Sequence, residues 1–236
     1  MKLFRMTMLM AAMVATTVTM YAQTAEEIVK KHIEAIGGEE NWKKVKTLKM
    51  KGSVTANGME IPVSIVNEDN KAMRMDYELM GTQNYMIVTT GEGWMYFPVQ
   101  GQTQPEALPA DQVKEMQDQL DLEGELVGYA EKGSKVEFVG KEDMEGAEVF
   151  KVKLIKKDGK EKTLFFDVAN YYLLKETQMV NAEGKEVEAT NTFSNFKKLK
   201  EGITVPMTVE SDMGPITLTD VEINTAIDEN LFKPSN

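Results

Sequence analysis

The fold is indicated by residues 47–79, TLKMKGSVTANGMEIPVSIVNEDNKAMRMDYEL. Apolar and polar side chains alternate along three runs of this stretch, which is the period of a β-strand with one buried face. Asn57-Gly58, the strongest short hairpin signal in the chain, separates the first two runs, and the polar residues 67–70 separate the second from the third. The stretch therefore predicts three strands joined by tight turns into an antiparallel meander.

The same rhythm continues along the rest of the chain. Turns containing Gly, Asn or Asp recur at hairpin spacing. Because the strands follow one another without intervening helices of crossover length, they favour an antiparallel meander over βαβ units. The further strands are expected at 82–90, 93–99, 134–141, 147–156, 161–167, 171–180, 185–196, 203–211 and 215–224.

Two amphipathic helical segments are expected outside the strands. Residues 24–37 open with Thr24-Ala25-Glu26-Glu27, a capping box in which the Thr24 hydroxyl accepts from the backbone and Glu27 reaches back. Residues 39–44 are expected to add a short turn. Residues 109–121 follow a loop rich in Gln and Pro and are expected to form a helical insertion between two halves of the meander.

Residues 1–22 have the pattern of a secretory signal peptide. Lys2 and Arg5 precede an uncharged stretch, residues 6–20, that is too short and too polar to span a membrane. Cleavage is expected near Ala22 or Gln23, and an N-terminal membrane anchor is the alternative. We therefore expect an exported protein with one domain, residues 23–236, and no stable membrane insertion.

The composition disfavours several functional classes. The chain has 38 acidic and 27 basic side chains and a formal net charge of −11, which disfavours nucleic acid and anionic membrane surfaces as partners. It has no Cys and one His, so zinc, thiol and Ser-His-Asp chemistry lack their residues. His32 is expected at the boundary of the first helix's apolar face. We predict no metal, no cofactor and no enzymatic activity, and a hydrolase using paired carboxylates is the alternative.

Methionine is unusually frequent. The chain contains 18 Met residues, of which twelve lie beyond residue 22, and several fall on alternating strand positions. Because Met is unbranched and polarizable, it fits irregular or changing apolar shapes. Two interpretations stay open: a Met-rich core, or an apolar concavity covered by amphipathic helices. A concavity would suit an acyl chain, since burying one CH₂ is worth about 0.8 kcal/mol.

Three stretches resemble one known family. They are AEEIVKKHIEAIGGEENWKKVKTLKMKG at 25–52, YMIVTTGEGWMYFP at 85–98 and VEINTAIDENLFKP at 221–234. In this order, with a helical insertion between the second and third, they resemble the opening helix and first strand, the hairpin before the insertion and the closing strand of the periplasmic outer-membrane lipoprotein-sorting family (LolA/LolB-like). The resemblance covers essentially the whole chain after the signal peptide.

The resemblance implies an α+β fold in the periplasm. The expected architecture is a strongly bent antiparallel sheet of about ten or eleven strands, forming an incomplete (half) β-barrel with a helical lid over its concave face. The implied function is a carrier that binds the acyl chains of a lipid or acylated lipoprotein in outer-membrane lipoprotein sorting. The alternative is a non-catalytic envelope interaction module that uses the same fold, without cargo, to bind envelope proteins.

The resemblance and the strand period together predict which side chains form the cavity. The cavity lining is expected to consist of apolar residues from two strands: Met59, Ile61, Val63, Ile65, Met73, Met75 and Tyr77. The lid is expected to close over it with apolar residues from both helical segments: Ile28, Ile33, Ile36, Val113, Met116 and Leu120.

The sequence departs from the family at two places. The family's central hairpin usually carries Asp-Gly, whereas Thr89-Thr90 occupy that place here and the glycine is Gly91. The better-studied carriers hold the lid with an Arg in a Lys-Arg-Pro turn after the second strand, and residues 67–70 contain no Arg. Arg74 lies inside the following strand, so we do not assign the lid role to it.

Overall fold

The computed structural model describes residues 23–56, 58–182, 185–211 and 214–235. The predicted signal peptide, residues 1–22, and Asn57 of the first predicted hairpin turn lie outside the described residues.

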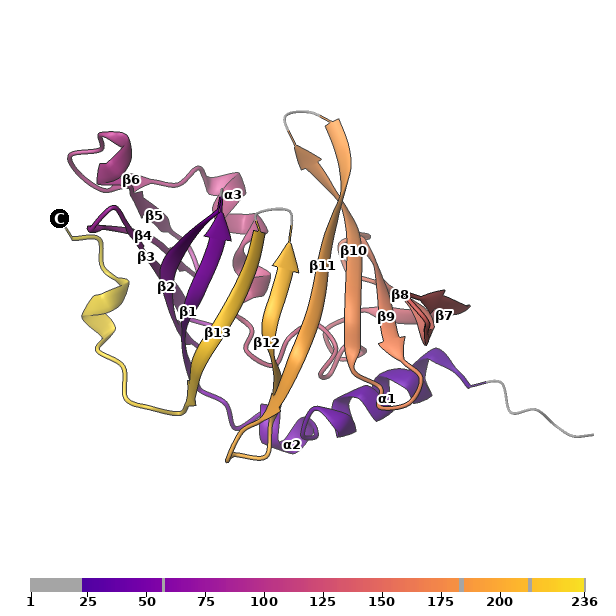
Figure 1. The fold of residues 1–236 in the computed structure, drawn as a ribbon. Coiled ribbons are helices and arrows are strands. Elements are labelled where there is room, and N and C mark those ends of the chain that lie inside the picture. Colours follow the sequence, from indigo (N-terminus) through magenta and orange to yellow (C-terminus); the bar gives the residue numbers. More distant parts are fainter. Residues whose placement is uncertain (1–22, 57, 183–184, 212–213, 236) are drawn as a thin grey trace, which may run out of the picture.

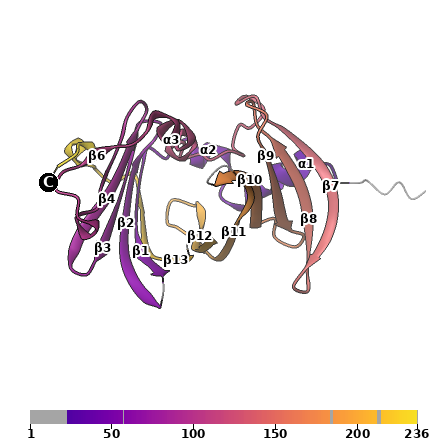
Figure 2. The same ribbon diagram turned by 90° about the horizontal axis from the view of Figure 1, so that it is seen from above.

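One antiparallel sheet of 13 strands forms the frame of the described chain. Its spatial order is β6-β5-β4-β3-β2-β1-β13-β12-β11-β10-β9-β8-β7, so two meanders meet where β1 pairs with β13. Figure 2 shows the sheet bent into an open trough, with β2–β4 on one wall and β7–β9 on the other. The strands are β1 Thr47–Ala56, β2 Met59–Glu68, β3 Ala72–Leu79, β4 Thr82–Thr89, β5 Gly93–Tyr96, β6 Glu106–Ala107, β7 Lys135–Met144, β8 Ala147–Ile155, β9 Glu161–Asp167, β10 Leu173–Ala182, β11 Lys185–Lys198, β12 Thr204–Ser211 and β13 Gly214–Ile223.

The number of strands exceeds the expected ten or eleven. Each alternating run forms a strand of its own, and the Gln/Pro-rich loop adds β6, which pairs through Ala107 with Trp94 of β5. A two-residue strand carries no periodicity that a sequence could reveal. The sheet is open, with β6 and β7 at its edges, so it forms an incomplete barrel.

The first helix, α1, spans Ala25–Ala35. Its capping box is formed as predicted, because the backbone N–H of Glu27 donates to Thr24 Oγ1 at 3.2 Å and the N–H of Thr24 donates to Glu27 Oε2 at 3.4 Å. Ile28 and Val29 are fully buried and pack against side chains of β7–β9 such as Phe166. A short helix, α2 (Glu39–Trp42), follows as the expected extra turn.

The helical insertion is shorter than the predicted 109–121. The α-helix α3 spans Ala110–Glu115 and is followed by a 3₁₀ turn, η2, at Gln117–Leu120. Val113 and Leu120 pack on the inner face of β2–β4, and residues 121–134 continue as a series of turns to β7. Figure 2 shows α1, α2 and α3 along the open side of the trough. Their role as a lid stays a prediction.

No helix in the described part of the chain has both the length and the apolar character needed to cross a membrane.

The C-terminal residues cover the outer face of the sheet (Figure 1). Phe232 of the 3₁₀ turn η3 (Glu229–Phe232) packs with Tyr85 and Ile87, which face away from α3. Arg74 donates to the Leu231 carbonyl at 2.9 Å and to the carboxylate of Asp76 at 2.7–2.9 Å. Arg74 therefore lies on the face opposite the helices, where it cannot hold a lid over the concave side.

We expect Arg74→Lys to loosen the C-terminal residues. Lysine cannot reproduce the bidentate contact with Asp76 and the bond to Leu231 at once, and hydrogen bonds to charged groups are worth about 1.5–3 kcal/mol. Amide hydrogen exchange over residues 229–235 should accelerate by about tenfold or more. The exposed Lys44→Met serves as a control, and unchanged exchange in the Arg74 variant would show that the apolar contact of Phe232 holds this segment alone.

Candidate functional site

The structure brings most of the predicted cavity lining together on the inner face of β2 and β3. Val63, Ile65, Met73, Met75 and Tyr77 belong to one apolar cluster. Ile61 lies outside that cluster, and Met59, at the start of β2, is 48% exposed.

The protein's own side chains fill this half of the trough. Val113 and Leu120 are buried in the same cluster, and Met116 packs against it. Three of the predicted lid residues therefore pack directly onto the predicted lining.

The other predicted lid residues lie over the opposite half of the sheet. Ile28 of α1 is buried in an apolar cluster with side chains of β7–β9, and Ile33 packs against that cluster. Ile36, just beyond α1, borders a separate hollow. The two helical segments thus cover different halves of the sheet, whereas the sequence pattern suggested one shared cavity.

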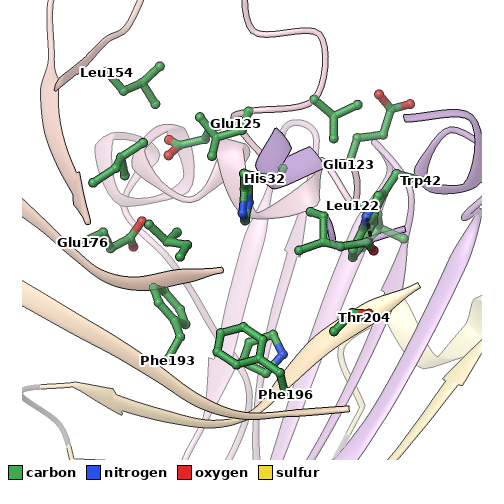
Figure 3. Close-up of a pocket in the computed structure, with 17 residues that line it drawn as sticks. His32, Trp42, Leu122, Glu123, Glu125, Leu154, Glu176, Phe193, Phe196 and Thr204 are labelled. Atoms are coloured by element: carbon green, nitrogen blue, oxygen red, sulfur yellow. Dashed lines mark hydrogen bonds between the residues drawn. The ribbon is translucent and has the colours of Figure 1, made fainter. Parts of the chain in front are cut away.

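The hollow lies between α1, α2 and residues 122–127 on one side and strands β8–β12 on the other (Figure 3). It has a volume of about 250 Å³, larger than an engineered apolar cavity of about 150 Å³ that binds benzene. Its walls are mainly aliphatic and aromatic side chains: Ile36, Trp42, Leu122, Leu126, Val127, Leu154, Leu164, Leu173, Phe193, Phe196 and Pro206. The polar side chains on its surface are His32, Glu123, Glu125, Glu176 and Thr204.

Sequence reasoning missed this hollow. Its walls come from segments scattered between residues 32 and 206, and of the predicted site residues only Ile36 contributes. Phe193 and Phe196 are spaced by an odd number, which would place them on opposite faces of a regular strand. Asn195 between them has a φ of +55°, and this break in the extended conformation lets both rings border the hollow. The sequence signal that could have indicated this break is Phe193-Ser194-Asn195-Phe196, in which Asn, a residue that tolerates positive φ, lies between two aromatic residues.

A buried histidine points into the hollow. His32 is 6% exposed, its ring lies 5.0 Å from that of Phe166, and its Nδ1 is 2.8 Å from the Tyr171 carbonyl oxygen. Burial lowers the pKa of His32 to about 4, although the bond to Tyr171 acts in the opposite direction. The imidazole is therefore neutral at pH 7. Figure 3 shows the ring directed into the space above Phe193 and Phe196.

Solved structures share this architecture. A LolA superfamily protein from Nitrosomonas europaea matches with a TM-score of 0.52 and 13% identity, over 89% of this chain and 98% of that chain. The chain has the LolA-superfamily fold. The resemblance carried by residues 25–52, 85–98 and 221–234 is thus confirmed at the level of the fold.

Two further structures match over similar lengths. A protein domain from Vibrio parahaemolyticus, described as outer membrane lipoprotein-sorting, has a TM-score of 0.52 and 16% identity, over 89% of this chain and 96% of that one. A DUF1329 family protein from Desulfovibrio piger has a TM-score of 0.57 and 10% identity, over 89% and 97%. No protein-family model and no curated protein sequence matches the chain.

In this example of the LolA fold, a network of charges borders the hollow. Glu125 pairs with Lys156 at 2.9 Å and with Lys162 at 2.6 Å, and Lys156 also contacts Asp118. Lys162 lies 3.7 Å from Glu176. Burial acts to lower the pKa of Lys156, but its bonds to Asp118 and Glu125 outweigh burial and raise it. These contacts tie the segment after η2 to the strands beneath it.

Among the described residues of the chain, no group of three or more Asp, Glu or His side chains is arranged to hold a metal ion.

We expect His32 to make the protein less stable in acid. The unfolded chain takes up a proton near pH 6.5, whereas the folded protein does so only near pH 4, so stability is lost as the pH falls from about 6.5 to about 4. At about 1.4 kcal/mol per pKa unit, the loss is about 3 kcal/mol. Urea unfolding of the wild-type protein and His32→Gln at pH 7 and pH 4 measures this difference, and parallel profiles would contradict it.

Proposed function

We propose that this protein is a periplasmic, non-catalytic carrier in outer-membrane lipoprotein sorting. In this proposal, the acyl chains of a lipid or an acylated lipoprotein bind in the hollow between α1 and β8–β12. The observation that carries the proposal is this hollow, which has mainly apolar walls formed by helix, strand and loop residues. The fold adds support, because one structure that shares it is described as outer membrane lipoprotein-sorting.

The walls suit hydrocarbon. Leu154 and Leu164 come from the sheet, Leu122 and Val127 from the covering segment, and Phe193 from β11. An acyl chain needs no polar partner along its length, and each buried CH₂ contributes about 0.8 kcal/mol. Binding in the hollow would also shield the acyl chain from water. This matters because exposed apolar surface promotes aggregation.

The hollow is smaller than most pockets that enclose a ligand. Pockets that enclose drug-sized ligands measure about 300–1,000 Å³, and this hollow measures about 250 Å³. A long acyl chain therefore has to displace part of the covering. The 121–134 segment is the candidate, because it consists of turns and includes Gly124 and Gly128 at φ of +74° and +63°, values that glycine adopts without strain.

The mechanism that follows has three steps. The 121–134 segment moves away from β8–β11 when the ion pairs of Glu125 open. The acyl chain then replaces contacts between this segment and the strands. Release occurs at a partner site with higher affinity, and no covalent step is required.

An interaction module without cargo is the second candidate. The inner face of β2–β4 favours it, because Val113, Met116 and Leu120 already fill that half of the trough. On this view the helices are permanent packing elements and the fold presents an outer surface to other envelope proteins.

We expect Phe193→Asp to weaken acyl binding by about tenfold or more. A carboxylate in the wall removes an apolar contact worth about 1.5–3 kcal/mol and has no cation to pair with. Titration with a fluorescent acyl amide measures the effect, and Phe138→Asp, which changes an exposed phenylalanine on β7, is the matched control.

The same titration tests the lining predicted from the sequence. If Met75→Asp weakens binding in a folded protein and Phe193→Asp does not, the cargo occupies the β2–β3 side. Protein purified from the cell envelope is also examined by native mass spectrometry. Absence of bound lipid, together with failure to bind the acyl amide, would favour the interaction module.

We expect Glu125→Gln to accelerate acyl uptake by roughly tenfold. The change removes the charge that pairs with Lys156 and Lys162, and breaking a partly buried pair weakens the closed arrangement. Raising NaCl from ~0.05 to ~0.5 M should accelerate uptake by the wild-type protein more than by the variant, because salt screens ion pairs. Stopped-flow fluorescence measures both rates.

Glu142→Gln is the matched control for this prediction. Glu142 of β7 pairs with Lys151 of β8 at 3.2 Å, and neither residue lines the hollow. Equal uptake rates in the wild-type protein and Glu125→Gln would show that the ion pairs do not limit opening.

A further inference from the structure

The side chains that border the hollow offer hydrogen-bond acceptors and no cation. His32, Glu123, Glu125, Glu176 and Thr204 are the polar members, and no Lys or Arg is among the described residues that line it. Trp42 Nε1 already donates to the Ile36 carbonyl at 3.2 Å. Among the described residues that line the hollow, the Thr204 hydroxyl is the remaining side-chain donor, and it can also accept a hydrogen bond.

The carboxylates are largely committed to partners outside the hollow. Glu125 holds Lys156 and Lys162, and Glu176 accepts from Asn191 Nδ2 at 2.9 Å. The lysines beside the hollow are thus neutralised by these acids. A ligand carrying a negative charge would meet carboxylates without an available cation, which is unfavourable in a space of low dielectric.

The proton of His32 is assigned by its hydrogen bond. A carbonyl oxygen can only accept, so the contact between Nδ1 and the Tyr171 oxygen at 2.8 Å places the proton on Nδ1. Nε2 then carries a lone pair. No described residue donates a hydrogen bond to Nε2, and the His32 side chain borders the hollow.

The turn before β10 maintains this arrangement. Tyr171 has a φ of +62°, which is uncommon for a residue with a side chain, and its N–H donates to the Asp167 carbonyl at 2.9 Å. Its ring stacks on Phe150 at 5.8 Å, and its hydroxyl accepts from Gln23 and Lys31. The backbone and the side chain of Tyr171 are thus both fixed, and they keep its carbonyl oxygen directed at His32.

We propose that the hollow selects acyl-bearing ligands whose head group is uncharged and donates a hydrogen bond, such as an amide or an alcohol, with His32 Nε2 as the acceptor. This inference rests on the proposed acyl-binding function and deepens it. Nε2 faces the hollow without a donor from the described protein, so an N–H or O–H group of a ligand can form a hydrogen bond there that an ester cannot form. A carboxylate or phosphate head is disfavoured by the acids around the hollow.

The test compares ligands that share one chain and differ in the head group. Dodecanamide, methyl dodecanoate and dodecanoate each compete with a fluorescent acyl amide for the full mature protein at neutral pH. We expect dodecanamide to bind roughly tenfold more tightly than either the ester or the carboxylate. Equal affinities, or tightest binding of the carboxylate, would overturn the inference and leave the carrier function standing. Failure of all three to bind would reject the carrier function itself.

A variant assigns the preference to one residue. His32→Leu should reduce the preference for the amide over the ester to about onefold. Thr204→Val, on the opposite wall, should keep the preference. Retention of the full preference in a folded His32→Leu protein would overturn the assignment.

The wild-type protein provides a readout that does not depend on the folding of a variant. Nitrogen-15 NMR of the single histidine should show an unprotonated Nε2 in the free protein. Its signal should shift when dodecanamide is added and stay in place with the methyl ester. A protonated Nε2 in the free protein, or equal shifts with both ligands, would contradict the proposal.

Discussion

The pairing of β1 with β13 is the contact on which the rest of the structure depends. It joins two meanders, one from each half of the chain, into a single sheet, and it brings Leu48 opposite Ile223. The seam contains a register shift beside Gly52, where a Cβ atom would lie 2.2 Å from the Thr217 carbonyl oxygen. A side chain at this position would clash with the backbone of β13, so glycine is required where the register of the seam shifts.

The trough has two unlike halves. Over β2–β4, a short helix and a 3₁₀ turn insert Val113 and Leu120 and close the space. Over β8–β12, α1 lies toward β7 and the remaining area is covered by residues without regular structure. The hollow lies on this side, between the segment without regular structure and the strands.

The polar residues acquire their roles from this division. Arg74 holds the C-terminal residues on the outer face, so the charge network of Glu125 supplies the ion pairs between the covering segment and the strands. His32, which the sequence placed at the edge of an apolar helix face, lies inside the hollow with one nitrogen committed to Tyr171. The sequence indicated only that His32 lies at the boundary of a helix face, whereas the structure places its imidazole at the wall of the hollow.

The sequence by itself determined the local elements, because their causes are local. Alternation over residues 47–79 specifies three strands, and the Thr24–Glu27 capping box starts α1. The same alternation put Val63 and Met73 on one inner face. The tertiary structure decided the β1–β13 seam, the split of the helices between two halves and the position of the hollow. These depend on contacts between residues far apart in the chain, such as His32 with Tyr171, and on a left-handed Asn195 that breaks the strand period. No local pattern encodes such contacts, since their energy arises only when distant segments pack together.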